Sequence, residues 1–324
     1  MSITMSDEEA HTPTGEAAWQ ESFYFNWADL DGESFGLTRI GFNPADGKAD
    51  GLLITVRDGR LEYVYPAIGV RVDDAERTTP ARRGVRVGAL GYTMREPLTR
   101  WHIDLAGRTR VDLSFTALGP PHDYSPAGAD TNDAAPSGAH HFEQFGAVTG
   151  HITVNGREHR VDAFGQRDKS WGVREWGAIR GWEWLTGHFG PDLAFNVTLS
   201  LVPGQDGPSG FLFRDGENVA VTDASVDYTW GRTPHVPAAA DIRLCDERGD
   251  VHHIHATALA QVPLVKKGLF LQETHARFEM QIDGVTRTGA GVLEHAWHAG
   301  TGAALRRLPD LAPVLARSIM GRIR

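Results

Sequence analysis

The chain has 324 residues, of which 41% are hydrophobic and 23% charged, a composition typical of a folded protein with one large domain or two smaller ones. Its formal net charge of −10, from 42 acidic and 32 basic side chains, disfavours nucleic acid as a partner. The single cysteine, Cys245, excludes an intramolecular disulfide and a cysteine-based zinc site, and no apolar run approaches the ~18 residues of a membrane span.

The first segment, residues 1–18, is polar and acidic and lacks the apolar stretch of a signal peptide. We therefore expect it to be a disordered leader. Together with the single cysteine, this segment favours a reducing, cytoplasmic location.

Strand-like runs occur in pairs along the rest of the chain. Four of these pairs are separated by an Asp-Gly or Asn-Gly turn, at Asp58-Gly59, Asn155-Gly156, Asp215-Gly216 and Asp283-Gly284. These dipeptides readily adopt the positive φ angles that tight hairpin turns require. The pattern predicts an all-β protein with antiparallel strands.

An internal repeat is also visible. A motif of the form G-x-x-acid-x-x-W occurs at residues 165–171 and again at 291–297, each time after a hairpin turn. Upstream, residues 105–118 similarly resemble residues 246–259, and a loop rich in Pro, Gly and Ala at 119–139 lengthens the first copy only. The order of the matches indicates a duplication.

The duplication predicts two similar β units, at residues 19–178 and 179–300. Antiparallel units of this kind usually close into barrels, which removes exposed edges. A barrel of about eight strands encloses room for one small apolar ligand. We therefore expect two tandem antiparallel β-barrels.

The last segment, residues 301–324, has helical character, and Pro309 and Pro313 are expected to divide it into two short turns. Its apolar stripe is expected to pack on the barrels and consists of Leu305, Leu308, Leu311, Leu315 and Ile319. The basic charge of this segment allows, at most, peripheral contact with a membrane surface.

Four tryptophans crowd the middle of the chain, namely Trp171, Trp176, Trp182 and Trp184. Indole faces can hold an apolar molecule and can stabilise a developing carbocation. These side chains are candidates for a substrate-binding wall, as is Trp297, the counterpart of Trp171 in the repeat. The alternative is that they fill the barrel cores.

A carboxylic acid within such a wall would lose its hydration, so its pKa would rise and it could donate a proton at neutral pH. Asp168 is the leading candidate for this acid, and Glu294 is its counterpart in the second copy. The alternative is a structural ion pair between Asp168 and Arg167 or Arg174.

Further polar candidates lie at residues 141–145, where strand alternation places His141 and Glu143 on one face. Glu143 is either a second pocket carboxylate or a solvent-facing residue. The H-x-H spacing of His253 and His255, with His140, His141 and His275 elsewhere, raises the possibility of a metal site. Because no third ligand has a diagnostic spacing, we expect no metal.

The chain resembles the AttH-like and carotenoid 1,2-hydratase (hydroxyneurosporene synthase) superfamily, specifically its actinobacterial branch. The resemblance is carried by residues 165–176, together with residues 19–26, 141–144, 148–150 and 289–297. The resemblance implies two lipocalin-like barrels in tandem. It also implies hydration of a terminal isoprenoid double bond, cyclisation of a prenyl chain or a pericyclic ring closure, in a pocket between or within the barrels.

Hydratases of this superfamily use an acidic residue in the segment that corresponds to Asp168. The chain departs from them immediately before this residue, where Gln166-Arg167 replaces their aromatic-His pair. This departure affects the identity of the substrate and of the acid.

The sequence therefore predicts a cofactor-free hydratase or cyclase for a hydrophobic, isoprenoid-like alkene. Asp168 or Glu294 would protonate the alkene, and Trp171, Trp182 or Trp184 would stabilise the cation, with Trp176, His141, Glu143 and Trp297 completing the substrate site. Two alternatives remain. A non-catalytic lipid or isoprenoid carrier needs only an apolar lining, and a pericyclase needs shape and hydrogen-bond donors without proton transfer.

Overall fold

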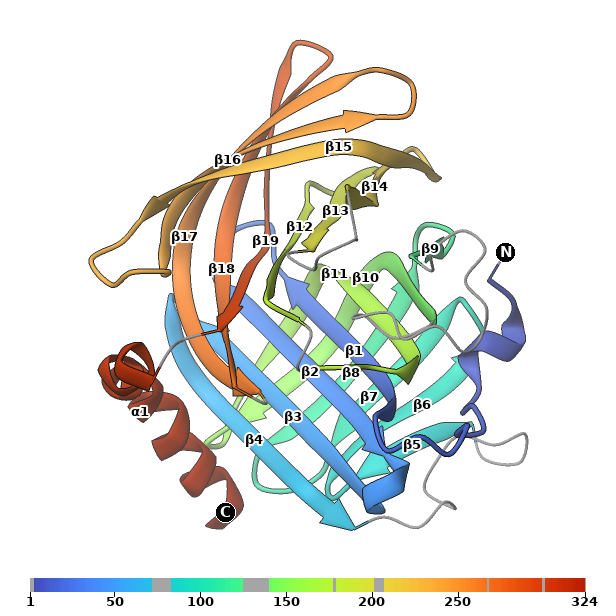
Figure 1. Cartoon of the computed structure of the whole chain (residues 1–324), viewed down its shortest axis with the longest axis vertical. Helices are drawn as coiled ribbons and strands as arrows, with labels where there is room; N and C mark the ends of the chain where they lie inside the picture. Colours follow the sequence, from blue (N-terminus) through green and yellow to red (C-terminus); the bar gives the residue numbers. More distant parts are fainter. Residues whose placement is uncertain are drawn as a thin grey trace.

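The computed structural model describes residues 3–71, 83–124, 140–176, 179–200, 207–266, 268–298 and 301–323. Figure 1 shows two strongly curved antiparallel sheets with one long helix at the side of the molecule. The predicted all-β fold with two tandem antiparallel barrels is confirmed.

The first sheet has eleven strands and is nearly closed, with the order β4-β3-β2-β1-β11-β10-β8-β7-β6-β5 and with β9 paired to β10. Its strands are β1 (Trp19–Ala28), β2 (Ser34–Asn43), β3 (Lys48–Arg57), β4 (Arg60–Arg71), β5 (Gly84–Val87), β6 (Leu90–Glu96), β7 (Arg100–Leu105), β8 (Arg110–Ala117), β9 (His122–Asp123), β10 (His140–Val154) and β11 (Arg157–Val173). Residues 125–139 of the predicted long loop lie outside the described residues.

The second sheet is a closed barrel of consecutive strands, β12 to β19. These are β12 (Gly181–His188), β13 (Leu193–Ser200), β14 (Pro208–Arg214), β15 (Glu217–Trp230), β16 (Pro237–Asp246), β17 (Val251–Lys266), β18 (Leu269–Ile282) and β19 (Val285–His298). In both sheets the last strand pairs with the first, β11 with β1 and β19 with β12. The two copies of the repeated motif therefore occupy corresponding strands.

All four predicted hairpin turns are present. Asp58, Asn155, Asp215 and Asp283 have φ angles of 49°, 52°, 51° and 52°, and the glycine that follows each also has a positive φ. This left-handed conformation matches the twist of the flanking strands.

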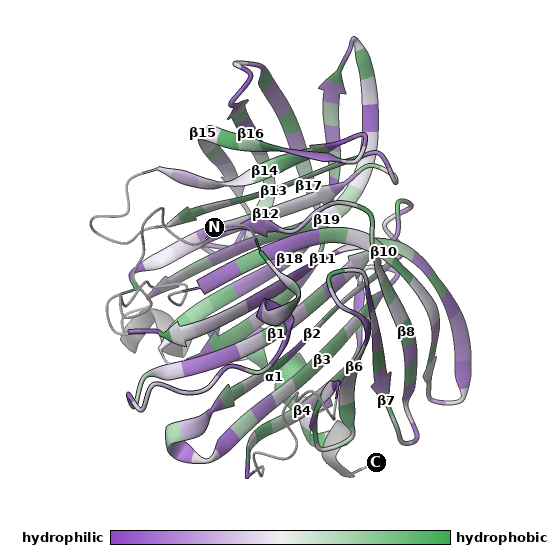
Figure 2. Cartoon of the chain, turned by 90° about the vertical axis from the view of Figure 1, so that its right-hand side faces the viewer, coloured by the Kyte–Doolittle hydropathy of each residue, from purple (hydrophilic) through white to green (hydrophobic). Residues whose placement is uncertain are grey.

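Alternation along the strands separates an inner from an outer face, and Figure 2 shows the resulting bands of hydrophobic and hydrophilic residues. In the first sheet, Phe23, Phe25 and Trp27 point inward and pack with residues from strands all around the sheet. Phe195 and Phe278 belong to the equivalent core of the second barrel. Side chains thus fill the inside of each barrel, where we had expected room for a ligand.

A third apolar cluster joins the two barrels. Phe35 and Leu37 on the outer face of the first sheet pack with Trp184 and Val262 of the second barrel and with Val314 of the C-terminal helix. This cluster fixes how the outer faces of the two sheets meet.

The expected disordered leader is wrong for the residues that the structure describes. Met5–Glu8 forms a 3-10 helix (η1), and a second one, Pro44–Asp46 (η2), follows β2. The Glu8 carboxylate is fully buried and accepts hydrogen bonds from Arg167 and, at 2.8 Å, from Trp101 Nε1. Arg167 is therefore the partner of Glu8, and it is not the partner of Asp168 that we had considered.

The C-terminal segment also differs from the prediction, because it forms one continuous helix, α1 (Thr301–Ile323), with both prolines inside it. The helix lies along β4 and β17 and buries Val314, whereas Leu308, Leu315 and Ile319 of the predicted packing stripe are exposed. No helix in the described part of the chain combines the length and apolar character needed to cross a membrane.

Candidate active site

A cavity of about 1000 Å³ lies between the two barrels. Its walls come from β1 to β4 and β9 to β11 of the first sheet, including His141 on β10, from β12 to β14 and β17 to β19 of the second barrel, and from one side of α1. The two sheets contribute two rows of polar and aromatic side chains.

The row on the first sheet follows directly from strand register. Five neighbouring strands each contribute one residue to this row, and each residue lies opposite the next: Leu52 on β3, Arg39 on β2, Tyr24 on β1, Asp168 on β11 and Glu143 on β10. Directly opposed residues share one face of a sheet, and the neighbours of Tyr24 point into the barrel core. This row therefore faces the second barrel.

The facing row belongs to the second barrel. Four neighbouring strands each contribute one residue, again with each opposite the next: Thr198 on β13, Trp184 on β12, Glu294 on β19 and Glu273 on β18. All four side chains line the cavity, as do Tyr24 and Asp168 from the other wall. The duplication thus places its two acidic residues on the two surfaces that meet.

Asp168 lies in a group of charged side chains. The His141 imidazole Nε2 is 3.4 Å from Asp168 Oδ2 and 3.3 Å from Glu143 Oε1. Burial works to raise the pKa of Asp168, but the positive charge of His141, its hydrogen bond, and the charges of Arg174 and Arg39 together lower it. Asp168 is therefore held as a carboxylate, which is the opposite of what a proton donor at neutral pH requires.

His141 carries the matching positive charge. Burial works to lower its pKa, but the charge and hydrogen bonding of Asp168 and Glu143 raise the pKa to about 10. Glu143 is fully buried, and its two carboxylate oxygens accept hydrogen bonds from Trp184 Nε1 (2.9 Å) and Gln166 Nε2 (3.0 Å). It links the two barrels behind the cavity wall and is not the solvent-facing residue that we had considered.

Glu273 and Glu294 form a contrasting pair. They lie opposite each other on β18 and β19, both are at least nine-tenths buried, and their carboxyl groups hydrogen-bond to each other. Trp182 Nε1 donates a further hydrogen bond to Glu294. In the described part of the chain, Glu273 Oε2 has no hydrogen-bond partner, which a neutral carboxyl tolerates better than a carboxylate.

The pKa values of this pair shift upward. Burial raises the pKa of Glu273 well above 4.5, and the charge and hydrogen bond of Glu294 raise it further. Burial also raises the pKa of Glu294, although the hydrogen bonds from Glu273 and Trp182 oppose the shift. Two carboxyl groups in contact cannot both ionise cheaply, so the pair retains a proton.

Glu273 is not among the residues predicted from the sequence, although the sequence contains a signal for it. The Asp283-Gly284 turn sets the register of the β18–β19 hairpin, with Ile282 opposite Val285. Counting outward equally in both directions from this turn places Glu273 opposite Glu294.

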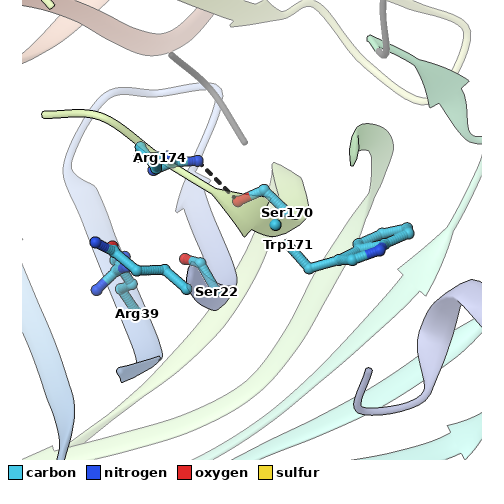
Figure 3. Close-up of a pocket in the computed structure, with 7 residues that line it drawn as sticks. Ser22, Arg39, Ser170, Trp171 and Arg174 are labelled. Carbon is cyan, nitrogen blue, oxygen red and sulfur yellow. Dashed lines mark hydrogen bonds between the residues drawn. The ribbon is translucent and has the colours of Figure 1, made fainter. Parts of the chain in front are cut away.

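Three of the five predicted tryptophans, Trp176, Trp182 and Trp184, line the cavity. Trp171 instead stacks between His11 and His140, with ring centroids 3.9 and 4.9 Å away, and Figure 3 shows it pointing away from Arg39 and Arg174. It borders a smaller pocket beside the main cavity. Trp297 stacks on His235 and His295, outside the cavity wall.

Two arginines supply positive charge to the cavity. Arg174 donates a hydrogen bond to Ser170 Oγ (3.1 Å) and lies over the Trp176 ring, 5.3 Å from its centroid. Burial lowers the pKa of Arg174 to about 10, with the charge of Asp168 opposing and that of Arg39 adding to the shift. Among the described residues, none hydrogen-bonds or ion-pairs with the half-buried Arg39 guanidinium, whose nearest opposite charges are Asp50 and Asp168.

The ligand atoms of His141, Glu143 and Asp168 lie within 4.8 Å of one another, a spacing that could hold a metal ion. A metal would compete with the proton that the raised pKa keeps on His141. Of the histidines considered from the sequence, only His141 belongs to this group of the described residues. His253 and His255 are exposed on β17, and His275 stacks on Phe35, buried between the barrels.

Solved structures with the same fold are similar over most of their length. CghA covers 90% of this chain and 94% of its own, with a TM-score of 0.65 and 14% identity. A candidate AttH from Nitrosomonas europaea (92% and 98%, TM-score 0.63, 16% identity) and kievitone hydratase from Nectria haematococca (91% and 93%, TM-score 0.61, 14% identity) are also similar. The chain therefore has the AttH-like, hydratase-type fold, whereas the actinobacterial branch stays a prediction.

A comparison with curated protein sequences gives no match. A family model, described as a domain of unknown function (DUF7064), matches residues 4–299. This match includes both barrels and every candidate-site residue outside α1, and the chain belongs to the DUF7064 family.

Proposed function

We propose that this protein is a cofactor-free hydratase or cyclase, which protonates the double bond of an apolar, isoprenoid-like substrate held between the two barrels. The observation that carries the proposal is the Glu273–Glu294 pair, two buried carboxyl groups in contact in the wall of an aromatic-lined cavity, with pKa values shifted upward. The fold that it shares with kievitone hydratase, a hydratase by name, agrees with this proposal.

The first step is transfer of one proton from the neutral Glu273–Glu294 pair, in which both carboxyl groups have a raised pKa, to the terminal carbon of the alkene; the other proton stays between the two carboxyl groups. The carbon–carbon π electrons form the new C–H bond, leaving a carboxylate on the enzyme and a carbocation on the substrate. A general acid of raised pKa suits this step because it is still protonated at neutral pH. We assign the proton to this pair because Asp168, the first candidate, is held as a carboxylate.

The second step is stabilisation and capture of the cation. The rings of Tyr24, Trp182 and Trp184 lie in the cavity wall near the acid pair and present negative π faces. Water then adds to the cation and returns a proton to the ionised pair; in a cyclase, an internal double bond adds instead, and loss of a proton restores the pair.

Arg39 orients the substrate in this proposal. A half-buried guanidinium with no direct partner among the described residues is a favourable site for an oxygen-bearing group. We assign it the polar end of the substrate, while the apolar chain lies along Trp176, Leu264 and Val314. We further propose that the protein acts in the cytoplasm, as expected from the sequence.

The test is incubation of the protein in D2O with a panel of prenyl alkenes ranging from monoterpene to carotenoid length. Mass spectrometry should detect deuterium on the carbon that receives the proton. Glu294→Gln and Glu273→Gln should abolish this incorporation, whereas Glu279→Gln, an exposed residue on the same strand as Glu273, should not. Tight binding without incorporation would instead indicate a carrier, and turnover that survives both variants would indicate a pericyclase.

A further inference from the structure

The solvent-facing side of α1 is apolar. Side chains are described for residues 307–320, and every exposed one among them is apolar. The largest are Leu308 (52% exposed), Leu315 (55%), Ile319 (59%) and Met320 (44%). A helix on the surface of a water-soluble protein normally shows the reverse arrangement.

Specific polar contacts fix this orientation. Arg307 is buried, donates a hydrogen bond to Gln272 Oε1 (2.6 Å) and forms an ion pair with Asp310 (3.3 Å). On the next turns, Arg317 Nε donates to the Glu62 carbonyl of β4 (3.2 Å). The polar side of α1 is thus bonded to the barrels, so the apolar side must face outward.

This apolar surface continues around the rim of the cavity. Ile68 at the end of β4 and Val265 at the end of β17 are 58% and 51% exposed. Both line the cavity, as does Leu315. These exposed apolar side chains therefore lie where the cavity meets the surface, and exposed apolar side chains at such a place often mark an interaction site.

The charge of the segment indicates which partner covers this rim. Residues 303–324 contain five arginines and one aspartate, in a chain whose net charge is −10. With Arg307 and Arg317 bonded to the barrels, the segment still carries Arg306, Arg322 and Arg324. An apolar helix face beside such basic residues fits the surface of an anionic bilayer, where apolar side chains enter the acyl region and arginines meet the phosphates. An acidic protein would otherwise be repelled by such a surface.

We propose that α1 docks this protein on an anionic lipid surface, with the rim formed by Leu315, Ile68 and Val265 facing the bilayer. An apolar ligand dissolved in the bilayer would then enter the cavity without crossing water. This inference goes beyond the proposed chemistry, and it holds or fails independently of any turnover.

The experiment is flotation of the full-length protein with phosphatidylcholine vesicles, with and without about one third phosphatidylglycerol. We expect binding to the anionic vesicles, weakened by high salt, and partition reduced about tenfold or more by the double variant Leu315→Ser/Ile319→Ser. The matched control is Val251→Ser/Val285→Ser, which changes two exposed valines beside the hairpin turns of the second barrel and should bind normally.

Analytical ultracentrifugation of the same variants measures their oligomeric state, and so tests whether a second copy of the chain covers the apolar face of α1 instead of a lipid surface. No flotation, or flotation that the double variant does not reduce, would overturn the proposal. A dimer that the double variant converts to a monomer, without vesicle binding by either form, would also overturn it.

Discussion

Asp168 and Glu294 occupy corresponding positions of the repeat, on opposite walls of one cavity, yet their surroundings differ in charge. Asp168 faces His141, Arg174 and Arg39, so its pKa is lowered despite burial. Glu294 faces a second carboxyl group, Glu273, so burial dominates and its pKa is raised. The duplication places an acid on each wall, but the neighbouring strands determine which acid keeps its proton.

The largest expected effect is on catalysis. Glu294→Gln should lower kcat about 10²- to 10⁴-fold, the usual contribution of a general acid, because the amide cannot donate the proton. Asp168→Asn should lower kcat less, because Asp168 is already ionised. Turnover by both variants is compared with that of Glu279→Gln, with near-UV circular dichroism to check the fold. A larger loss in Asp168→Asn would reverse the two assignments.

The next effect concerns the ion pair on the Asp168 wall. His141→Gln should destabilise the protein by about 3–5 kcal/mol, because it leaves the Asp168 carboxylate without its cation. The matched control is His255→Gln, which removes an exposed imidazole 2.7 Å from Asp241 and should cost about 0–1 kcal/mol. Urea unfolding measures both, and equal effects would contradict the buried ion pair.

A smaller effect is expected at the contact between the walls. Trp184→Phe removes the hydrogen bond to Glu143 while keeping most of the ring, and we expect a loss of about 1–3 kcal/mol. Trp230→Phe, on the exposed face of β15, should change stability by less than about 0.5 kcal/mol. Thermal unfolding distinguishes them, and an unchanged midpoint for Trp184→Phe would count against this bond.

The smallest effect is the pH dependence of stability. Because the pKa values of Glu273 and Glu294 are raised in the folded state, the pair adds stability that is complete below about pH 4.5 and lost as pH rises through the raised values. Glu273→Gln removes one of the coupled acids, so its melting temperature should fall less than that of the wild type between pH 5 and pH 9. A parallel fall in both proteins would show that the pair ionises normally.

Features set by adjacent residues could be predicted from the sequence. The Asn155-Gly156 and Asp283-Gly284 turns carry their own backbone preference, and they gave the hairpins and the corresponding strands of the repeat. The same local reasoning failed at Pro309 and Pro313, which were expected to divide the C-terminal segment into two short turns. Packing of Val314 and the bonds of Arg307 to the barrel hold the helix together across both residues.

Features set by distant residues could not be predicted. The cations that ionise Asp168 come from β2, from β10 and from the end of β11, which meet only after the sheet has formed. The position of the cavity depends on how the outer faces of the two sheets meet. The alternation of apolar and polar residues along a strand distinguishes its two faces, but it does not indicate what covers the outer one. The Glu273–Glu294 pair lies between these two cases. The register of the β18–β19 hairpin, which a local turn sets, would have been enough to place Glu273 opposite Glu294.

The protonation state of the Glu273–Glu294 pair at neutral pH, on which the proposed function depends, can be measured directly. Carbon-13 NMR of protein labelled at the glutamate side-chain carboxyl should give a signal that remains that of a protonated acid at pH 7 and disappears in Glu273→Gln or Glu294→Gln. If every glutamate carboxyl has ionised by pH 6 in the folded protein, the pair is no proton donor and the proposed function is wrong.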